Sequence, residues 1–397
     1  MSAPSPSAAP PALHQPWLRR QAGATGAPIA VLIVLGVVAA VVLLITGARH
    51  PVGLLIATPL SAIAMAVVLA CYLWLDRWEP EPARLLLLAF LWGATVAVVV
   101  SLVLELATSE VLGTGLVLTV AGPAIEEAAK GAFLLLMLTG VRRHEFDGVV
   151  DGLVYAGVTA IGFAFIEDIG YVAQSFGEGT ETGVATVVMR LVMAPFAHPL
   201  FTSLTGLGFG LAISKGRGSV RWLYPVAGYL GAVALHSLWN SSLTFGLRGY
   251  IVVYVVIMVP VFIGGVLLAR RHRRREQDVV RKQLPAMVYY RWVTPAEAGW
   301  LQSISARRSW LRSVRSRSGK AGAQALEHFQ LAATELAFLR DRVQRGVGPA
   351  DAYDLHAELV HSLLASRAQA LHPLHENPLP ASFTPVRPVP PPELARR

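Results

Sequence analysis

The chain has 397 residues, of which 54% are hydrophobic and 15% are charged. A mean hydropathy of +0.52 lies outside the range of soluble globular proteins and indicates an integral membrane protein. The net charge of +9 does not indicate nucleic-acid binding, because most basic residues flank apolar runs or lie in the last third of the chain. The single cysteine, Cys71, excludes a disulfide framework and a cysteine metal site.

Long apolar runs follow a short polar N-terminus. Residues 1–27 are rich in Ala, Pro and Ser, and we expect them to be disordered and cytoplasmic. About 20 apolar residues are needed to cross a bilayer as a helix. Eight runs reach that length: 28–47, 51–75, 84–108, 115–139, 149–172, 185–213, 222–246 and 250–269. The sequence therefore predicts an all-α, polytopic membrane protein with about eight transmembrane helices, spanning residues 28–270.

The loops between these runs differ in charge on the two sides of the membrane. The outer loops hold only Arg49 and Arg248 if the N-terminus is cytoplasmic. The inner segments then hold Arg19, Arg20, Arg77, Arg84, Arg142, Arg143, Lys215, Arg217, Arg221, Arg270, Arg271, Arg273, Arg274 and Arg275. Because Lys and Arg accumulate on the cytoplasmic side, we expect a multi-pass protein of a bacterial-type plasma membrane with both termini in the cytoplasm.

After the last span the sequence becomes more polar. Helical apolar spacing at 295–317, 322–346 and 350–369 predicts a cytoplasmic helical extension over residues 271–371. We expect this extension to regulate activity or to bind a cytoplasmic partner. Residues 372–397 contain eight prolines and are predicted to be disordered. The basic part of the extension, beside Trp300 and Trp310, either lies on an anionic membrane surface or is a solvated helix.

Ionisable and amide side chains within the predicted spans form a short set: Glu105, Glu126, Glu127, Lys130, Glu167, Asp168, Arg190, His198, His236 and Asn240. A charged side chain in the bilayer costs at least about 2.5 to 3.5 kcal/mol on insertion scales, so such residues need a structural or functional reason. Residues three or four apart share a helix face, so Glu126 and Glu127 both reach Lys130. From the outer ends of the spans, the Glu and His residues on four helices lie about 5 to 13 residues deep, which predicts a common polar cavity.

Structural interpretations of these residues compete with the functional one. A histidine in a membrane helix often bonds only to a neighbouring helix, and the two glutamates with Lys130 form an ion pair that could simply lock helices together. We expect Asp168 to cap or solvate an outer helix end, Glu105 to be structural and Arg190 to snorkel to the interface.

Two chemistries fit the combined set. A carboxylate near imidazoles can activate water as a general base, with His and Asn donating hydrogen bonds to an oxyanion. Glu and neutral His are also good zinc ligands, and a Zn²⁺-bound water would then be the nucleophile. The HExxH spacing is absent, so a metal would need ligands from separate helices.

Four segments, read in order, resemble the motifs of the PrsW family of intramembrane proteases, which is related to the type II CAAX prenyl proteases and bacteriocin-processing enzymes. They are "EEAAK" (126–130), "FAFIE" (163–167), the histidine of "FAHPLFTSLTGLGFG" (196–210) and "HSLWN" (236–240). The resemblance covers roughly residues 70 to 245, including "DRWEPEPARLL" (76–86). It implies an intramembrane endopeptidase acting on a membrane protein or peptide, such as a transmembrane anti-sigma factor.

The resemblance also implies seven catalytic-site residues: Glu126, Glu127, Lys130, Glu167, His198, His236 and Asn240. The first two are the implied acid/base pair, with Lys130 as their ionic partner, and Asn240 assists the oxyanion. We favour a glutamate mechanism. If a metal such as Zn²⁺ is bound, its candidate ligands are Glu127, Glu167, His198 and His236. Asp168 stands where we expect an amide in many relatives.

Two other functions use the same residues. A transporter or channel would conduct through the polar cavity, although the sequence shows no inverted repeat. A noncatalytic membrane scaffold would use the polar residues only to join helices, with the extension as its working part.

Overall fold

The computed structural model describes residues 26–139, 145–214, 218–349 and 351–371. Within these ranges every ordered element is a helix, and no strand occurs. The predicted all-α class is therefore confirmed. The predicted disorder of 1–27 and 372–397 falls almost wholly outside the described residues. So do six basic residues used for sidedness: Arg19, Arg20, Arg142, Arg143, Lys215 and Arg217.

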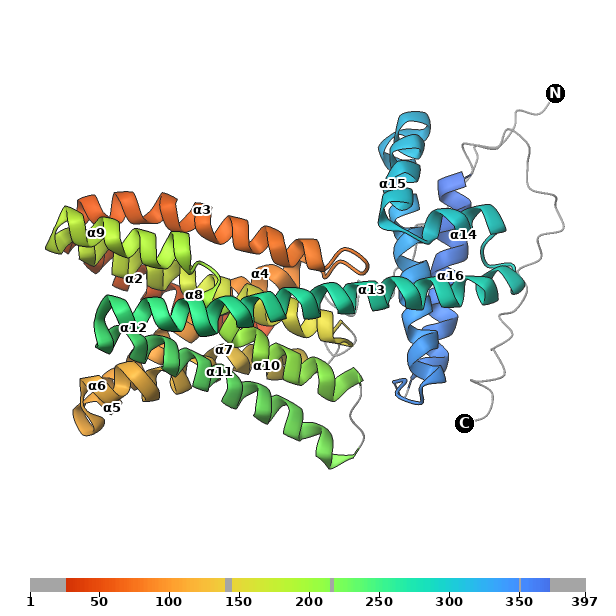
Figure 1. Ribbon diagram of the computed structural model, residues 1–397. Coiled ribbons are helices and arrows are strands. Elements are labelled where there is room, and N and C mark those ends of the chain that lie inside the picture. Colours follow the sequence, from red (N-terminus) through yellow and green to blue (C-terminus); the bar gives the residue numbers. More distant parts are fainter. Residues whose placement is uncertain (1–25, 140–144, 215–217, 350, 372–397) are drawn as a thin grey trace, which may run out of the picture. The chain divides into compact units, whose positions relative to one another are not determined.

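The chain divides into two compact units, Gly23–Arg275 and the part that begins at Glu276. The second unit contains α14 (Pro295–Leu301), α15 (Ile304–Gln344) and α16 (Ala352–Leu371) (Figure 1). Its predicted helix at 295–317 is in fact two helices, because Thr294 and Ser303 each cap a helix N-terminus. Gly319, with φ of 65°, kinks α15.

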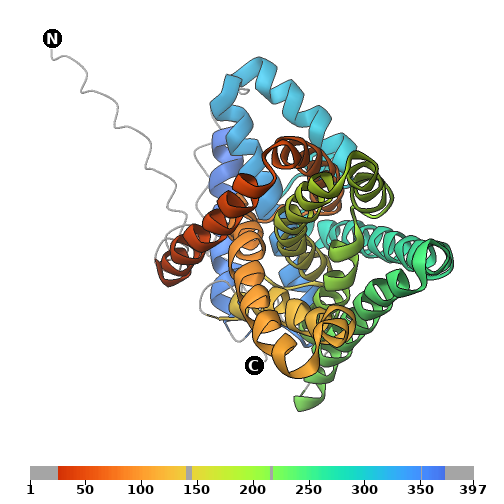
Figure 2. The same ribbon diagram turned by 90° about the vertical axis from the view of Figure 1, so that its left-hand side faces the viewer.

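The helices of the first unit are shown lengthwise in Figure 1 and nearly end-on in Figure 2. They are α2 (Gly26–Arg49), α3 (Pro51–Leu75), α4 (Ala83–Leu91), η1 (Trp92–Ala97), α5 (Val98–Leu112), α6 (Thr114–Leu116), η2 (Val117–Ala121), α7 (Gly122–Met137), α8 (Val149–Glu178), α9 (Thr180–Val187), η4 (Val188–Met193), α10 (Ala197–Ser214), η5 (Ser219–Trp222), α11 (Leu223–Ser242), η6 (Leu243–Phe245), α12 (Gly246–Val253), η7 (Tyr254–Met258) and α13 (Val259–Tyr289), the last of which continues past Arg275. Elements η1, η2, η4 and η7 are π-helical turns.

Six helical stretches among the described residues are long and apolar enough to cross a membrane: Leu32–Arg49, Pro51–Leu75, Ala83–Leu112, Val149–Glu178, Thr180–Ser214 and Ser219–Tyr289. A multi-pass membrane protein is thus confirmed, with six such stretches where the sequence predicts eight. The predicted span at 115–139 is not among them, because it carries three charges in one turn of α7. The predicted spans at 222–246 and 250–269 fall within one stretch, which Gly246 interrupts with φ of 65°.

Helix α8 is the most deeply buried of these stretches, with 19 of its 30 residues buried. Its glycines allow neighbouring backbones to approach closely. A Cβ atom at Gly152 would lie 2.2 Å from the carbonyl oxygen of Gly206 on α10, and a Cβ at Gly206 would lie 2.1 Å from the oxygen of Gly152. Small residues at such contacts are how membrane helices gain close packing.

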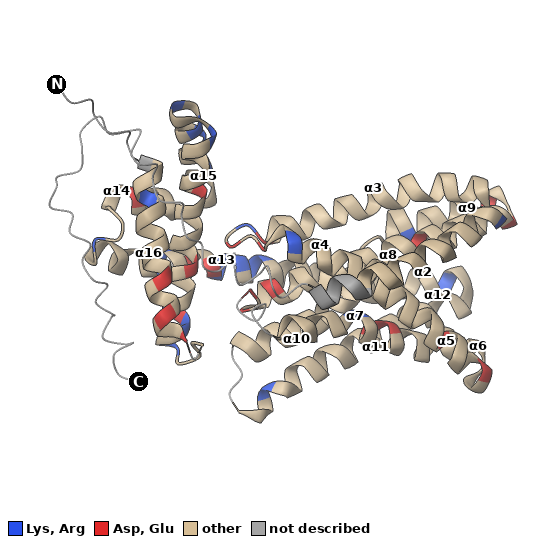
Figure 3. Cartoon of the chain, turned by 180° about the vertical axis from the view of Figure 1, so that it is seen from behind, with Lys and Arg blue, Asp and Glu red and all other residues tan. Residues whose placement is uncertain are grey.

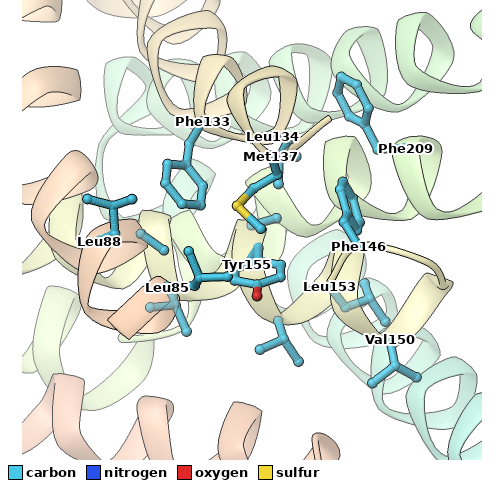
Figure 4. Close-up of a cluster of buried hydrophobic side chains, with 14 of the residues drawn as sticks. Leu85, Leu88, Phe133, Leu134, Met137, Phe146, Val150, Leu153, Tyr155 and Phe209 are labelled. Atoms are coloured by element: carbon cyan, nitrogen blue, oxygen red, sulfur yellow. The ribbon is translucent and has the colours of Figure 1, made fainter. Parts of the chain in front are cut away.

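A buried apolar cluster fixes the position of α7 against α8 (Figure 4). Phe133, Leu134 and Met137 of α7 are completely buried, and the ring of Phe133 lies 6.2 Å from that of Tyr155 on α8. The Tyr155 hydroxyl donates a hydrogen bond to Glu81 Oε2 at 2.5 Å, which ties the segment before α4 to the same cluster. These contacts set the rotation of α7, and therefore the direction of the charged side chains one and two turns earlier.

The glycine contact between α8 and α10 gives a stability prediction. We expect Gly152→Ala to lower the melting temperature of the purified protein in detergent, because overpacking of a tight contact costs about 1 to 3 kcal/mol. The control is Gly170→Ala on the same helix, where an added Cβ meets no atom within 4 Å. Equal melting temperatures for the two variants would contradict the close approach of the two backbones.

Candidate active site

Six of the seven sequence-predicted site residues come together from four helices. Helix α7 supplies both glutamates and Lys130, and α8, α10 and α11 supply Glu167, His198 and His236 respectively. The five residues on α7, α10 and α11 are buried, with exposed fractions between 0% and 8%. The structure thus brings residues more than 100 positions apart in the sequence into direct contact.

The ammonium group of Lys130 lies at the centre of this set. Its Nζ is 2.7 Å from Glu127 Oε1, 3.3 Å from Glu126 Oε2 and 3.2 Å from His198 Nδ1. An ammonium has three protons to donate, and these three acceptors use all of them. Nζ also lies 4.1 Å from the centroid of the Phe163 ring, within the range of a cation–π interaction. A completely buried lysine is therefore held as a cation by the atoms around it.

The contacts of His198 determine which of its nitrogens carries a proton. Lys130 can only donate, so His198 Nδ1 accepts, and the ring is neutral. Its Nε2 lies 2.7 Å from Glu167 Oε2, which makes Nε2–H the donor to that carboxylate. The centroid of the Phe163 ring lies 5.4 Å from that of the imidazole.

His236 has the same arrangement with a different carboxylate. Its Nδ1 lies 3.2 Å from Glu127 Oε1, and an ionised carboxylate only accepts, so the proton is on Nδ1. The ring stacks on Phe201 at 4.7 Å. The lone pair of Nε2 then faces Glu126, whose Oε2 is 3.9 Å away.

The two adjacent glutamates have different environments. Glu127 is fully buried and accepts from Lys130, from His236 and from the hydroxyl of Thr202 at 2.8 Å. Glu126 has one close partner, Lys130 at 3.3 Å, while His198 Nδ1 and His236 Nε2 both lie 3.9 Å from its Oε2. Glu127 is thus saturated with donors, whereas Glu126 retains acceptor capacity that faces two imidazoles.

Arg190 joins two carboxylates of α8. Its guanidinium lies 2.5 Å from Glu167 Oε2 and 2.6 Å from Asp168 Oδ1. The expectation that Asp168 caps a helix end is therefore wrong, and Arg190 forms ion pairs within the protein. Asp168 is 3% exposed, and α8 continues ten residues beyond it to Glu178.

Hydrogen bonds from α12 and η7 support the backbone around Arg190. Arg190 lies in the π-helical turn η4, after which the helix is interrupted at 194–196. The Tyr250 hydroxyl donates to the carbonyl of Met189 at 3.0 Å, and the Tyr254 hydroxyl to that of Met193 at 2.9 Å. These bonds satisfy carbonyl groups on either side of Arg190, as required for irregular backbone at membrane depth.

Asn240 is the predicted site residue that the structure does not bring into contact with the Lys130 cluster. Its side-chain amide donates to the backbone carbonyl of Leu118 in η2 at 3.0 Å. Asn240 shares a helix face with His236, as the sequence predicts, but it joins α11 to η2 instead of facing the carboxylates.

A metal ion would find a suitable donor set at Glu126, His198 and His236. One ligand atom from each of these residues lies within 4.8 Å of the others. A carboxylate and two imidazoles form a known catalytic zinc set, and the other nitrogen of each histidine bonds to a carboxylate, as zinc-binding histidines usually do. The residues therefore fit a metal, provided that Lys130 gives up its contact with His198 Nδ1. This set contains Glu126 in place of the predicted Glu127 and Glu167, which are paired with Lys130 and Arg190.

Three contributors were not assigned a site role from the sequence: Thr202, Arg190 and Phe163. Thr202 lies four residues after His198 on α10, so the shared helix face was a usable signal. Phe163 lies four residues before Glu167 on α8, so the two residues also share a helix face, which the sequence shows. For Arg190 the sequence offered only its charge within a span, which by itself is compatible with snorkelling.

The comparisons with known proteins indicate a single family. The model of the family described as "PrsW family intramembrane metalloprotease" matches residues 81–265, which include every residue of the cluster. The matched region of this chain belongs to the PrsW family. Family membership supports a membrane-embedded peptidase.

Curated PrsW proteases are similar to about half of the chain. Protease PrsW of Geobacillus kaustophilus is 29% identical over 188 residues, covering 45% of this chain and 76% of that protein. The Clostridioides difficile protein is 26% identical over 50% of this chain and 85% of its own length. The Bacillus subtilis protein is 26% identical over 54% of this chain and 94% of its own length. No solved structure matches the chain.

The Arg190 contacts give a prediction about charge pairing. We expect Arg190→Met to lower the free energy of unfolding by about 3 kcal/mol, because it leaves two carboxylates of α8 without their cation. Adding Glu167→Gln and Asp168→Asn to the same chain should restore part of the melting temperature. Arg248→Met, at an exposed arginine, is the control. A melting temperature unchanged in Arg190→Met would show that the ion pairs contribute nothing.

Proposed function

We propose that this chain is an intramembrane endopeptidase in which Glu126 activates the attacking water. The observation that carries the proposal is the difference between the two glutamates: Glu127 is saturated by three donors, and Glu126 faces two imidazoles across 3.9 Å. One water molecule can bridge Glu126 Oε2 and His236 Nε2 at hydrogen-bond distance from both. A neutral His236 accepts one proton of that water, and Glu126 accepts the other.

The reaction then follows from the positions of these groups. Glu126 takes a proton as the water oxygen attacks the scissile carbonyl carbon, and the carbonyl oxygen becomes an oxyanion. The positive charge of Lys130, 3.3 Å from the same carboxylate, stabilises this developing charge in a buried site. When the C–N bond breaks, Glu126 returns the proton to the leaving amine nitrogen. Atoms and charges balance without a covalent intermediate.

The remaining residues hold the reacting groups in place. Glu127 and Thr202 fix the tautomer of His236 and the position of Lys130. Glu167 orients His198 in the same way and is itself neutralised by Arg190. Asn240 supports the packing of α11 and is not assigned an oxyanion role.

A zinc ion bound by Glu126, His198 and His236 would supply a Lewis acid that lowers the pKa of a bound water. We favour the glutamate mechanism because Lys130 already bonds to His198 Nδ1, the nitrogen that a metal ion would need. Metal-dependent hydrolysis by the same residues is the second candidate, and the donor set within 4.8 Å is the observation that favours it.

The burial of the cluster and the distribution of Lys and Arg support a substrate class and a membrane orientation. Because the cluster is buried in an apolar helical bundle, its substrate is a membrane-spanning or membrane-associated protein, and a transmembrane anti-sigma factor is one such candidate. We propose that residues 28–270 form the protease domain of a bacterial-type plasma membrane, with 271–371 as a cytoplasmic extension. Both termini are then cytoplasmic, as the distribution of Lys and Arg favours.

The first test replaces the water-activating group. We expect Glu126→Gln to reduce cleavage of a co-reconstituted single-pass membrane substrate by at least about a hundredfold, because general-base catalysis contributes about 10²- to 10⁴-fold. Cleavage is measured as appearance of product in proteoliposomes, and the melting temperature reports whether the variant folds. His236→Ala should show the same loss.

Asn240→Ala is the matched control, since it removes a polar side chain one turn from His236. It should keep most of the activity. Full activity in Glu126→Gln and His236→Ala would contradict the proposed peptidase site, and ion flux through the reconstituted protein in the absence of any cleavage would favour a transporter.

The second test separates the two mechanisms. Under the glutamate mechanism, purified active protein contains less than one zinc per chain, and a membrane-permeant chelator leaves its activity unchanged. Stoichiometric zinc, together with a chelator-induced loss that added zinc reverses, would replace this mechanism with the metal-dependent one. Metal content is measured by mass spectrometry, and His198→Ala should then release the metal.

A further inference from the structure

The C-terminal unit carries a basic surface that the proposed protease site does not use. Between Glu297 and Glu327 the chain has six basic residues and no acidic residue. Most of this segment is the first half of α15, up to the kink at Gly319. Figure 3 shows blue Lys and Arg segments gathered at one end of this helix. Because this basic segment contains no acidic residue, an external anion is a plausible partner for its exposed side chains.

The structure separates the basic residues of this segment into two groups. Arg307 is 7% exposed and donates to the carbonyl of Leu301 and the hydroxyl of Thr334, so it belongs to the interior of the unit. It shares its side of the helix with Trp310 and Val314, which are also buried. The other five are exposed: Arg308, Arg312, Arg315, Arg317 and Lys320.

Three of the exposed arginines form a regular stripe. Arg308, Arg312 and Arg315 follow one another at intervals of four and three residues, so they lie on one face of α15. Arg317 and Lys320 lie next to the kink. Trp300 is 43% exposed, and its indole lies 6.3 Å from that of Trp310, which is buried. Tryptophan and arginine together are typical of segments at a membrane surface.

We propose that this face, defined as Arg308, Arg312, Arg315, Arg317 and Lys320 with Trp300 beside it, binds anionic lipid headgroups of the membrane that the protein itself spans. Chain connectivity supports this partner. The apolar run that ends near Ala269 is followed by five arginines at 270–275, and 33 positions separate Arg275 from Arg308. The face is thus tethered to the membrane-spanning unit by 33 residues of chain, which raises its effective concentration at the lipid surface.

Charge complementarity favours lipid over an acidic segment of this chain. Each Lys or Arg near an anionic bilayer strengthens binding about fivefold, and the effect falls off within a Debye length of the surface. Long arginine side chains and an exposed indole suit a layer of lipid phosphates and glycerol groups, where the ring lies among the headgroups. A nucleic acid also presents phosphates, and the experiment below distinguishes the two partners.

The test uses the full-length protein in lipid nanodiscs. Cys71 is exposed, so it is first replaced by alanine, and Ser316→Cys then places one fluorescent label beside the basic stripe. Quenching of the label by acrylamide is compared in discs of phosphatidylcholine alone and in discs that also contain phosphatidylglycerol. We expect the label to be protected in the anionic discs, and the protection to decrease as salt is raised.

Two matched variants assign the effect to the stripe. Arg312→Gln with Arg315→Gln removes two charges from the face, and the ratio of protected to exposed label should fall about thirtyfold. Lys282→Gln with Arg291→Gln removes two exposed charges elsewhere in the same unit and should leave the ratio unchanged.

Three results would overturn the proposal. They are equal quenching in the two kinds of disc, equal loss of protection in the two double variants, and protection by an oligonucleotide in phosphatidylcholine discs where phosphatidylglycerol gives none. The last result would assign the face to nucleic acid. None of these outcomes depends on protease activity, so the proposal is tested separately from the function of the buried cluster.

Discussion

The completely buried ammonium of Lys130 is the constraint on which the arrangement of the membrane unit depends. A charge in that position is stable only if acceptors surround it, and the acceptors come from α7 itself and from α10. Because His198 must present a lone pair to Lys130, its other nitrogen must donate, which places Glu167 of α8. Because Lys130 keeps Glu127 ionised, Glu127 can accept a hydrogen bond from Nδ1–H of His236 on α11. One cation therefore determines the orientation of side chains on four helices.

Much of the fold and part of the site could be predicted from the sequence, for a physical reason. Apolar length identifies a membrane helix without knowledge of its neighbours, and the spacing of Glu126 and Lys130 along α7 fixes a contact within one helix. Gly152 and Gly162 of α8 are positions where neighbouring backbones approach, a contact that the sequence alone does not identify. The number of spans was less predictable, because the charges that the site requires make α7 less apolar.

The remaining features depend on contacts that single-helix periodicity does not contain. Arg190 reaches α8 from a π-helical turn, where side chains leave the 3.6-residue spacing, and an interruption follows at 194–196. Asn240 shares a face with His236 as predicted, yet the carbonyl of Leu118 lies closer to its amide than the carboxylates do. The distinction between Glu126 and Glu127 required knowledge of which donors the neighbouring helices supply.

The glycine contact between α8 and α10 also restricts how a polypeptide could reach Glu126. Gly152 and Gly206 place two backbones against each other with no side chain between them, and α8 is enclosed along most of its length. A substrate helix could not pass between these two helices without separating their main chains. Helix α11, many of whose residues are exposed, is joined to α7 by a hydrogen bond from the Tyr229 hydroxyl to the carbonyl of Ala124. A polypeptide approaching the cluster would therefore have to displace less tightly packed backbone at α11 than at the α8–α10 contact.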